Sequence, residues 1–190
     1  MRNSRALPWL ALSVLLLVSC DDDDDHEIVV YHAVLKQINP QLGLTAPLGN
    51  VEIVVEGDDI VHVNVDATGL DAVDHPMFLR VGTRCPGPTS DLNNDGYVDV
   101  NEGLPSYGSI LVALDSDLSQ STTDPGSFPV GPIISYRENV EVDDFETSLS
   151  GRTIVIHGVG SAPPATVTPL VGMSTSHSVP ILCGILVEID

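Results

Sequence analysis

The sequence predicts an all-β fold, an antiparallel β-sandwich or Greek-key barrel. Beyond the first 26 positions its apolar residues are dominated by Val and Ile, the β-branched types that pack well on a pleated sheet. The 16 glycines and 14 prolines divide the chain into short runs separated by turns. No run in this part repeats its apolar residues with the period of a helix. Short strands without helices favour two packed antiparallel sheets.

The clearest strand lies at residues 60–66, where three valines alternate with His62, Asn64 and Asp66. Alternation with a period of two places one kind of side chain on each face, so this strand has one buried face. We expect a single domain over residues 28–190. Its predicted strands lie at residues 26–35, 51–55, 60–66, 77–81, 109–114, 133–142, 153–159 and 181–189.

Residues 1–19 have the pattern of a secretory signal peptide, with Arg2 and Arg5 followed by an apolar run over residues 6–18. The run is too short for a stable membrane span. It ends in Leu-Val-Ser-Cys, which resembles the processing box of bacterial lipoproteins and implies that Cys20 is the lipidated first residue of the mature chain. The alternative is ordinary secretion, with Cys20 unmodified.

Residues 20–27 are expected to form an acidic tether, because Asp21–Asp25 are five consecutive carboxylates that repel one another. A lipidated Cys20 would carry more than one acyl chain, which suffices to hold a protein on a membrane without a spanning helix. The predicted location is therefore the bacterial cell envelope, attached to a membrane through lipid. The choice between the inner and the outer membrane stays open.

The composition is strongly acidic, with 27 Asp and Glu against 7 Lys and Arg and a formal net charge of −20. Such a surface repels the phosphates of nucleic acids and of anionic lipid headgroups. Nucleic acid is therefore not an expected partner. The same surface attracts cations.

A cation-binding pattern occupies residues 91–102, Asp-Leu-Asn-Asn-Asp-Gly-Tyr-Val-Asp-Val-Asn-Glu. Ca²⁺ takes about 6–8 oxygen ligands, so a chain that wraps it presents an oxygen at alternate residues. The oxygens here have the spacing of an EF-hand calcium loop, and Gly96 permits its sharp turn. The expected calcium ligands are Asp91, Asn93, Asp95, the Tyr97 carbonyl, Asp99 (directly or through water) and Glu102.

The flanks of this loop predict no helices. Two prolines and a glycine interrupt residues 84–90, and residues 103–108 contain Gly103, Pro105 and Gly108. A single loop without paired helices suits a structural calcium ion better than a calcium switch. Two alternatives remain: an acidic surface loop that holds no ion, and a dockerin-like module that binds a protein partner through the loop.

Cys85 and Cys183 remain once Cys20 is assigned to lipid. Two thiols of an exported protein usually form a disulfide in an oxidising compartment. We expect this bond to tie the residues before the acidic loop to the last strand. The alternative is a pair of reduced, buried cysteines.

Four motifs together resemble copper/zinc superoxide dismutase: VNVDATGL at residues 63–70, Cys85, GRTIVIHG at 151–158 and CGIL at 183–186. Their order is also similar to that in bacterial dismutase-like and CHRD-type exported proteins. The resemblance covers about residues 28–189. It implies a dismutase-like Greek-key sandwich, a calcium-type loop inserted after Cys85, and pairing of that cysteine with the one in the last strand.

The metal ligands of that family are missing. Its His-x-His copper pair falls on Phe78 and Arg80, and only His157 matches a copper-ligand position. Phe has no lone pair and Arg stays protonated, so neither can hold copper. The family's zinc histidines lie where this chain has the acidic loop and no histidine. We therefore expect a protein that is not an enzyme and holds neither copper nor zinc.

The predicted function is a non-catalytic, lipid-anchored sandwich with one structural calcium ion and a protein partner in the envelope that the sequence does not identify. The alternative is a divergent copper/zinc superoxide dismutase or another copper redox protein. A novel transition-metal site would combine His157 with His75 and His177, which lie outside the family's positions. The acidic cluster of Asp143, Asp144 and Glu146 is expected to be a solvated surface.

Overall fold

The computed structural model describes residues 27–57, 59–118, 126–139, 148–163, 165–169 and 172–189. Several predictions lie outside these described residues. They are the signal peptide at residues 1–19, the lipidated Cys20 with residues 21–26 of the tether, the strand residues Val140 and Val142, and the cluster of Asp143, Asp144 and Glu146.

The described residues form one antiparallel sheet of nine strands, which confirms the all-β prediction. Along the sheet the strands follow the order β5-β4-β7-β8-β1-β2-β3-β6, and β9 pairs with β1. The strands are β1 (Ile28–Gln37), β2 (Leu48–Glu56), β3 (Asp59–Thr68), β4 (Met77–Arg80), β5 (Ile110–Ala113), β6 (Ile133–Glu138), β7 (Thr153–His157), β8 (Pro180–Ile185) and β9 (Val187–Ile189). The described part of the chain also has short 3-10 helices at Pro40–Leu42, Pro88–Ser90 and Ser176–Ser178. The Greek-key connection and the likeness to dismutase stay predictions.

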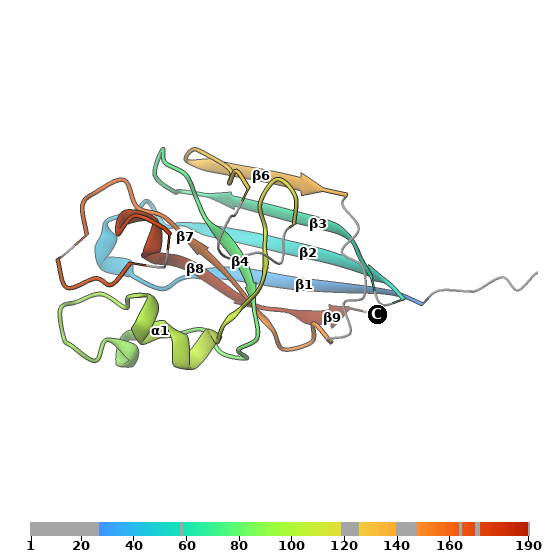
Figure 1. The fold of residues 1–190 in the computed structure, drawn as a ribbon, viewed down its shortest axis with the longest axis horizontal. Helices are drawn as coiled ribbons and strands as arrows, with labels where there is room; N and C mark the ends of the chain where they lie inside the picture. The colour runs from blue at the N-terminus through green and yellow to red at the C-terminus, as the bar shows by residue number, and fades with distance from the viewer. Residues whose placement is uncertain are drawn as a thin grey trace, which may run out of the picture.

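The sheet curls around β1, so that its two halves make a sandwich-like body (Figure 1). One edge of β1 pairs with β2 along most of its length. The other edge pairs with β8 at Lys36 and Gln37 and with β9 from Val30 to His32. Aliphatic side chains from both halves meet in a core in which Leu35, Ile53 and Ile154 are fully buried. Every strand pair found among the described residues lies within residues 28–189.

The predicted burial pattern of residues 60–66 is observed in β3. Val63 and Val65 are buried, Asn64 is half-buried and Asp66 is exposed. The strand predicted at 181–189 is instead two strands, β8 and β9. The backbone of Leu186 breaks it, because its N–H donates to the Arg152 carbonyl and its carbonyl accepts from Gly151.

The prediction of no helix after the acidic loop is wrong, because Val100–Tyr107 forms the helix α1. Asp99 and Glu102 build a capping box that satisfies the free N–H groups of its first turn. The ring of Tyr107 packs against the backbone of Gly103. A Cβ added to Gly103 would lie only 2.3 Å from Cε1 of Tyr107. Gly103 and Pro105 normally destabilise a helix. Here the capping box and the packed ring of Tyr107 offset that destabilisation.

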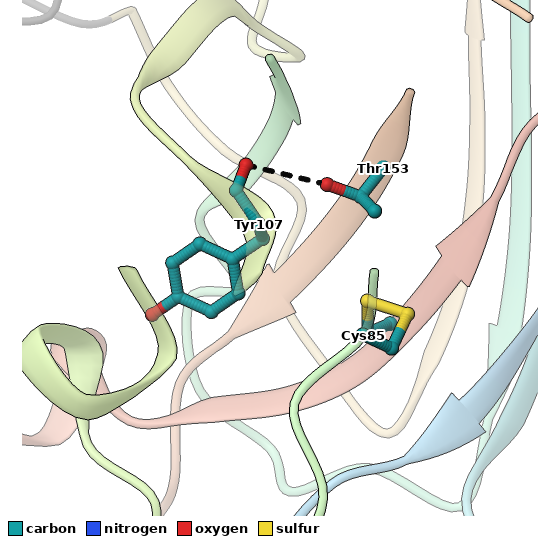
Figure 2. Close-up of a disulfide and its surroundings, with 4 residues drawn as sticks. Cys85, Tyr107 and Thr153 are labelled. Atoms are coloured by element: carbon teal, nitrogen blue, oxygen red, sulfur yellow. Dashed lines mark hydrogen bonds between the residues drawn. A yellow bond between two sulfur atoms is a disulfide. The ribbon is translucent and has the colours of Figure 1, made fainter. Parts of the chain in front are cut away.

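The predicted disulfide between Cys85 and Cys183 is confirmed, with Cα atoms 5.7 Å apart. It joins the segment before the acidic loop to β8 (Figure 2). Close to it, the Thr153 hydroxyl on β7 donates to the Tyr107 carbonyl at 3.4 Å. Ile38, Val98, Tyr107, Val155 and Cys183 form a second core cluster there. This cluster fastens the loop and α1 to the sheet.

Among the described residues, no helix has the length and apolar character needed to cross a membrane.

Candidate cation site

The acidic loop, residues 91–102, lies between the 3-10 helix Pro88–Ser90 and α1. Its second half is pinned to the body by Asn39, whose side chain is fully buried. Asn39 Oδ1 accepts from the Val98 N–H at 2.8 Å, and its Nδ2 donates to the carbonyls of Val98 at 3.0 Å and Pro180 at 2.8 Å. Asn39 therefore connects the second half of the loop to Pro180 at the start of β8.

The first half of the loop turns its side-chain oxygens inward. Asp91 accepts through Oδ1 from the Asp95 N–H at 3.2 Å and through Oδ2 from the Gly96 N–H at 2.9 Å. Asn93 Oδ1 accepts from the same Asp95 N–H at 2.8 Å. The backbone reverses through Asn94 and Gly96, with φ of 57° and 90°. Gly96 supplies the left-handed turn that the motif predicts.

Asp95 is the most strongly hydrogen-bonded carboxylate of this half. Its Oδ1 accepts from the Tyr97 N–H at 2.9 Å. Its Oδ2 accepts from Asn93 Nδ2 at 3.1 Å and from the Thr166 hydroxyl. The Thr166 hydroxyl, followed by the bonds from Tyr97 and Asn93, lowers the pKa of Asp95, and partial burial opposes this. Asp95 is thus held as an anion.

The second half of the loop uses its carboxylates to hold backbone N–H groups. Asp99 Oδ1 accepts from the N–H of Asn101 at 2.8 Å and of Glu102 at 3.0 Å. Asp99 Oδ2 accepts from the Thr168 N–H at 3.0 Å. Glu102 Oε2 accepts from the Asp99 N–H at 3.0 Å. Its other oxygen, Oε1, accepts from Leu92 at 2.8 Å and from Asn93 at 3.1 Å, which joins the end of the loop to its beginning.

The donor chemistry of this loop fits a hard cation, because every predicted ligand is an oxygen. Asp91, Asn93 and Asp95 lie around one turn, with Tyr97 next to it. Asp99 and Glu102 are engaged with N–H groups of the loop, α1 and Thr168. Within the described ranges, no three Asp, Glu, His or Cys side chains gather as a metal-holding group. The loop is folded and closed by its own carboxylates in this conformation.

The positions matched to the dismutase copper ligands come together in space. Phe78 and Arg80 on β4 both contact His157 at the end of β7. The Phe78 and His157 rings meet edge to face with centroids 5.6 Å apart. Arg80 Nη2 donates to His157 Nε2 at 3.3 Å, so His157 Nδ1 carries the proton and donates to the Ser178 carbonyl at 3.2 Å.

Arg80 is a buried cation held by rings and neutral acceptors. Its guanidinium lies over the Tyr107 ring, 4.4 Å from the centroid, and 5.2 Å from the Phe78 centroid. Nη1 donates to the Gly108 carbonyl at 3.1 Å, while the buried Nε has no hydrogen-bond partner among the described residues. Burial lowers the pKa of Arg80 to about 10. Burial, and then the Arg80 charge, lower the pKa of His157 well below its ordinary value.

The histidines considered for a transition-metal site do not share a ligand position. His75 is fully buried and directs its ring nitrogens to the carbonyls of His157 and Asp71, each at 2.9 Å. His157 directs its own nitrogens to Arg80 and the Ser178 carbonyl. His177 lies in the 3-10 helix Ser176–Ser178 and is half-buried.

Four residues that contact the acidic loop or Arg80 were not predicted from the sequence. Asn39, Thr166 and Thr168 form hydrogen bonds to the acidic loop from distant parts of the chain, and the ring of Tyr107 packs against the Arg80 guanidinium. No local pattern marks the first three. Tyr107 follows Val100 by seven residues, a helical spacing that could have indicated an apolar stripe.

A scan against protein-family models finds no match, and a search of the curated proteins finds no similar protein.

Proposed function

We propose that this chain is an exported, lipid-anchored, non-catalytic β-sandwich of the dismutase-like type, in which residues 91–102 hold one structural Ca²⁺. The observation that carries the calcium proposal is the inward turn of Asp91, Asn93 and Asp95 around Gly96. Oxygen side chains at alternate positions and a left-handed glycine at the sixth are what a calcium loop needs.

Asp91, Asn93, Asp95, the Tyr97 carbonyl, Asp99 and Glu102 would hold the ion. Bound Ca²⁺ supplies positive charge among four carboxylates that otherwise repel one another. Asn39 and the capping box connect these residues to β8 and to α1. Stabilisation of the loop is therefore expected to extend to the second core cluster around Cys183.

The proposal that the protein is not an enzyme is supported by Arg80. A guanidinium lies beside the only histidine that matches a copper-ligand position, and it donates to the Nε2 lone pair that a metal would need. The alternative hypothesis, a copper redox protein, requires that His157 Nε2 lose its hydrogen bond from Arg80 and bind a metal instead.

The helix α1 favours a second candidate, the dockerin-like interaction module. A calcium loop followed directly by a helix is half of an EF-hand. Leu92 in the loop and Leu104 on α1 are 72% and 45% exposed, which gives a partner apolar contacts beside the loop. In this case Leu104→Asp would abolish capture of the partner while the calcium response of the domain persists.

Thermal melting of residues 21–190 tests the calcium proposal. Calcium at about 100 times its Kd should raise Tm by roughly 5–10 °C over the EDTA sample. Asp95→Ala should remove that response, and Asp74→Ala, which deletes an exposed carboxylate elsewhere, should retain it. Equal melting curves with calcium and with EDTA would refute a structural ion.

A further inference from the structure

A groove of about 740 Å³ runs along the outer side of the sheet where β1, β8 and β9 meet. Aliphatic side chains that reach solvent line it: Val34, Ile185, Val187 and Ile189 are 54%, 39%, 59% and 49% exposed. We call these four residues the apolar strip. They account for four of the ten large exposed apolar side chains in the described part of the chain. Apolar side chains grouped in this way mark a binding surface more often than scattered ones do.

One end of the groove is cationic. Lys36 on β1 stands opposite Cys183 in the strand register, and Arg84 precedes Cys85, the partner of Cys183 in the disulfide. Both cations therefore lie at the disulfide end of the groove, which they line. In a chain with a net charge of −20, two cations at one place are a local exception.

The other described cations are engaged elsewhere. Arg80 is buried against Tyr107. Arg137 forms an ion pair with Asp66 at 2.6 Å, and Arg152 donates to the Ser148 carbonyl at 3.2 Å. Neither Lys36 nor Arg84 makes an ion pair within the described residues. Their charges are thus available to a ligand.

The groove is cationic at one end and apolar along the rest of its length, which matches an amphiphile with an anionic head and an apolar tail. Ile189, at its far end, stands opposite Val30 in the register of β1, and Lys36 marks the cationic end of the same strand. At about 3.3 Å per residue the stretch from Val30 to Lys36 spans about 20 Å. One leaflet of a bilayer core is about 15 Å thick, so a single acyl chain fits along this length.

We propose that the groove binds a single-chain anionic amphiphile of the fatty-acid type. Its anionic head lies between Lys36 and Arg84, and its acyl chain covers the apolar strip toward Ile189. Charge complementarity favours this ligand over a neutral or cationic one. The proposal does not depend on calcium binding, since it uses none of residues 91–102.

Calorimetric titration of residues 21–190 with straight-chain fatty acids tests the proposal, in EDTA and below the micelle concentration of each acid. We expect one ligand per chain, with affinity rising roughly three- to fourfold per added CH₂ until the acyl chain reaches the end of the strip. An alkyltrimethylammonium ion of the same length should bind at least about tenfold more weakly.

Charge reversals locate the head. Lys36→Glu and Arg84→Glu should each weaken binding by about tenfold or more, because each removes a charge-assisted contact. Arg137→Glu makes the same change in net charge outside the groove and should leave the affinity within about twofold. Ile189→Glu should weaken the binding of long acids and leave that of short ones unchanged. Ile133→Glu, at a more exposed isoleucine on β6, should change the affinity for neither.

Three outcomes would overturn the proposal. The first is equal affinity for anionic and cationic amphiphiles. The second is unchanged affinity in both Lys36→Glu and Arg84→Glu. The third is binding only to intact anionic vesicles or to an acidic peptide, which would assign the groove to a membrane surface or to a protein partner. All these substitutions lie on exposed or half-buried side chains, and urea melts of each variant verify that it is folded.

Discussion

Arg80 Nη2 donates to Nε2 of His157 over 3.3 Å inside the body of the protein. A buried cation usually requires an anionic partner, yet this guanidinium is held by two aromatic rings and neutral acceptors. The bond also fixes the tautomer of His157 and occupies its free lone pair. The positions that the resemblance matches to copper ligands thus hold a guanidinium cation. Two predictions rest on this cation.

Arg80→Ala should lower the free energy of unfolding by about 2–4 kcal/mol. The change leaves a cavity and deprives the Gly108 carbonyl and His157 of a donor, although it also removes a costly buried charge. Arg80→Met, which fills most of the volume without the charge, should cost less. Arg84→Ala on the surface is the control and should stay within about 0.5 kcal/mol. Urea denaturation measures all three, and an Arg80→Ala protein as stable as the control would contradict the structural role.

Stability should fall as the pH drops below about 6.5, in part through His157. Its pKa is lowered in the folded state, so between the ordinary value of about 6.5 and the folded value only the unfolded chain binds the proton. The contribution of neutral His157 to the free energy of unfolding is complete above pH 6.5. Below that pH it declines by up to about 1.4 kcal/mol per pH unit. Urea melts at pH 7, 6 and 5 should show a smaller decline in His157→Gln. The same decline in both proteins would show that His157 is not the cause.

Reduction of the disulfide should destabilise the protein by about 4–5 kcal/mol in the chain-entropy estimate. The bond between Cys85 and Cys183 closes a loop with a sequence separation of 98 and ties the acidic loop to β8. Urea melts with and without dithiothreitol measure the loss. The double variant Cys85→Ser/Cys183→Ser should have the same reduced stability with and without dithiothreitol. A wild-type protein that melts equally in both conditions would argue against a stabilising bond.

Asn39→Ala should cost about 2–4 kcal/mol, because three hydrogen bonds from its side chain join the acidic loop to the start of β8. The groups left behind on Val98 and Pro180 are buried. Asn50→Ala, on an exposed position of β2, is the matched control and should change little. Urea denaturation compares the two variants, and equal stabilities would show that the loop does not need this anchor.

Glu102→Gln separates helix capping from calcium binding. The amide keeps one acceptor oxygen for the capping box but places its NH₂ where Oε1 accepts from the Leu92 and Asn93 N–H groups, so in EDTA the variant should lose about 1–3 kcal/mol. The predicted bidentate ligand is lost, so the calcium-induced rise in Tm should shrink sharply. A rise equal to that of the wild-type protein would remove Glu102 from the ligand set.

The strands were largely predictable from the sequence, because alternation and turn residues report local structure directly. The pattern at residues 60–66 predicts β3, and the cysteine pair predicts the bond to β8. The helix α1 was not predicted, because Gly103 and Pro105 read as breakers. What stabilises it there is a capping box and the fit of the Tyr107 ring on Gly103, which depend on geometry in three dimensions.

The acidic loop was predictable as a motif but its contacts were not. Alternate oxygens predict a cation loop from spacing alone. The partners Asn39, Thr166 and Thr168 come from segments far away in the chain, so only the folded sheet brings them to the loop. The meeting of Arg80, Tyr107 and His157 likewise depends on the pairing of β4 with β7 and on the position of α1.

The most direct test of the calcium proposal is a metal count on residues 21–190 after dialysis against millimolar CaCl₂, by atomic emission or native mass spectrometry. We expect one calcium ion per wild-type chain and none in Asp95→Ala. A wild-type chain that retains no calcium, or an Asp95→Ala chain that retains the same amount, would contradict the proposal that residues 91–102 form a calcium site.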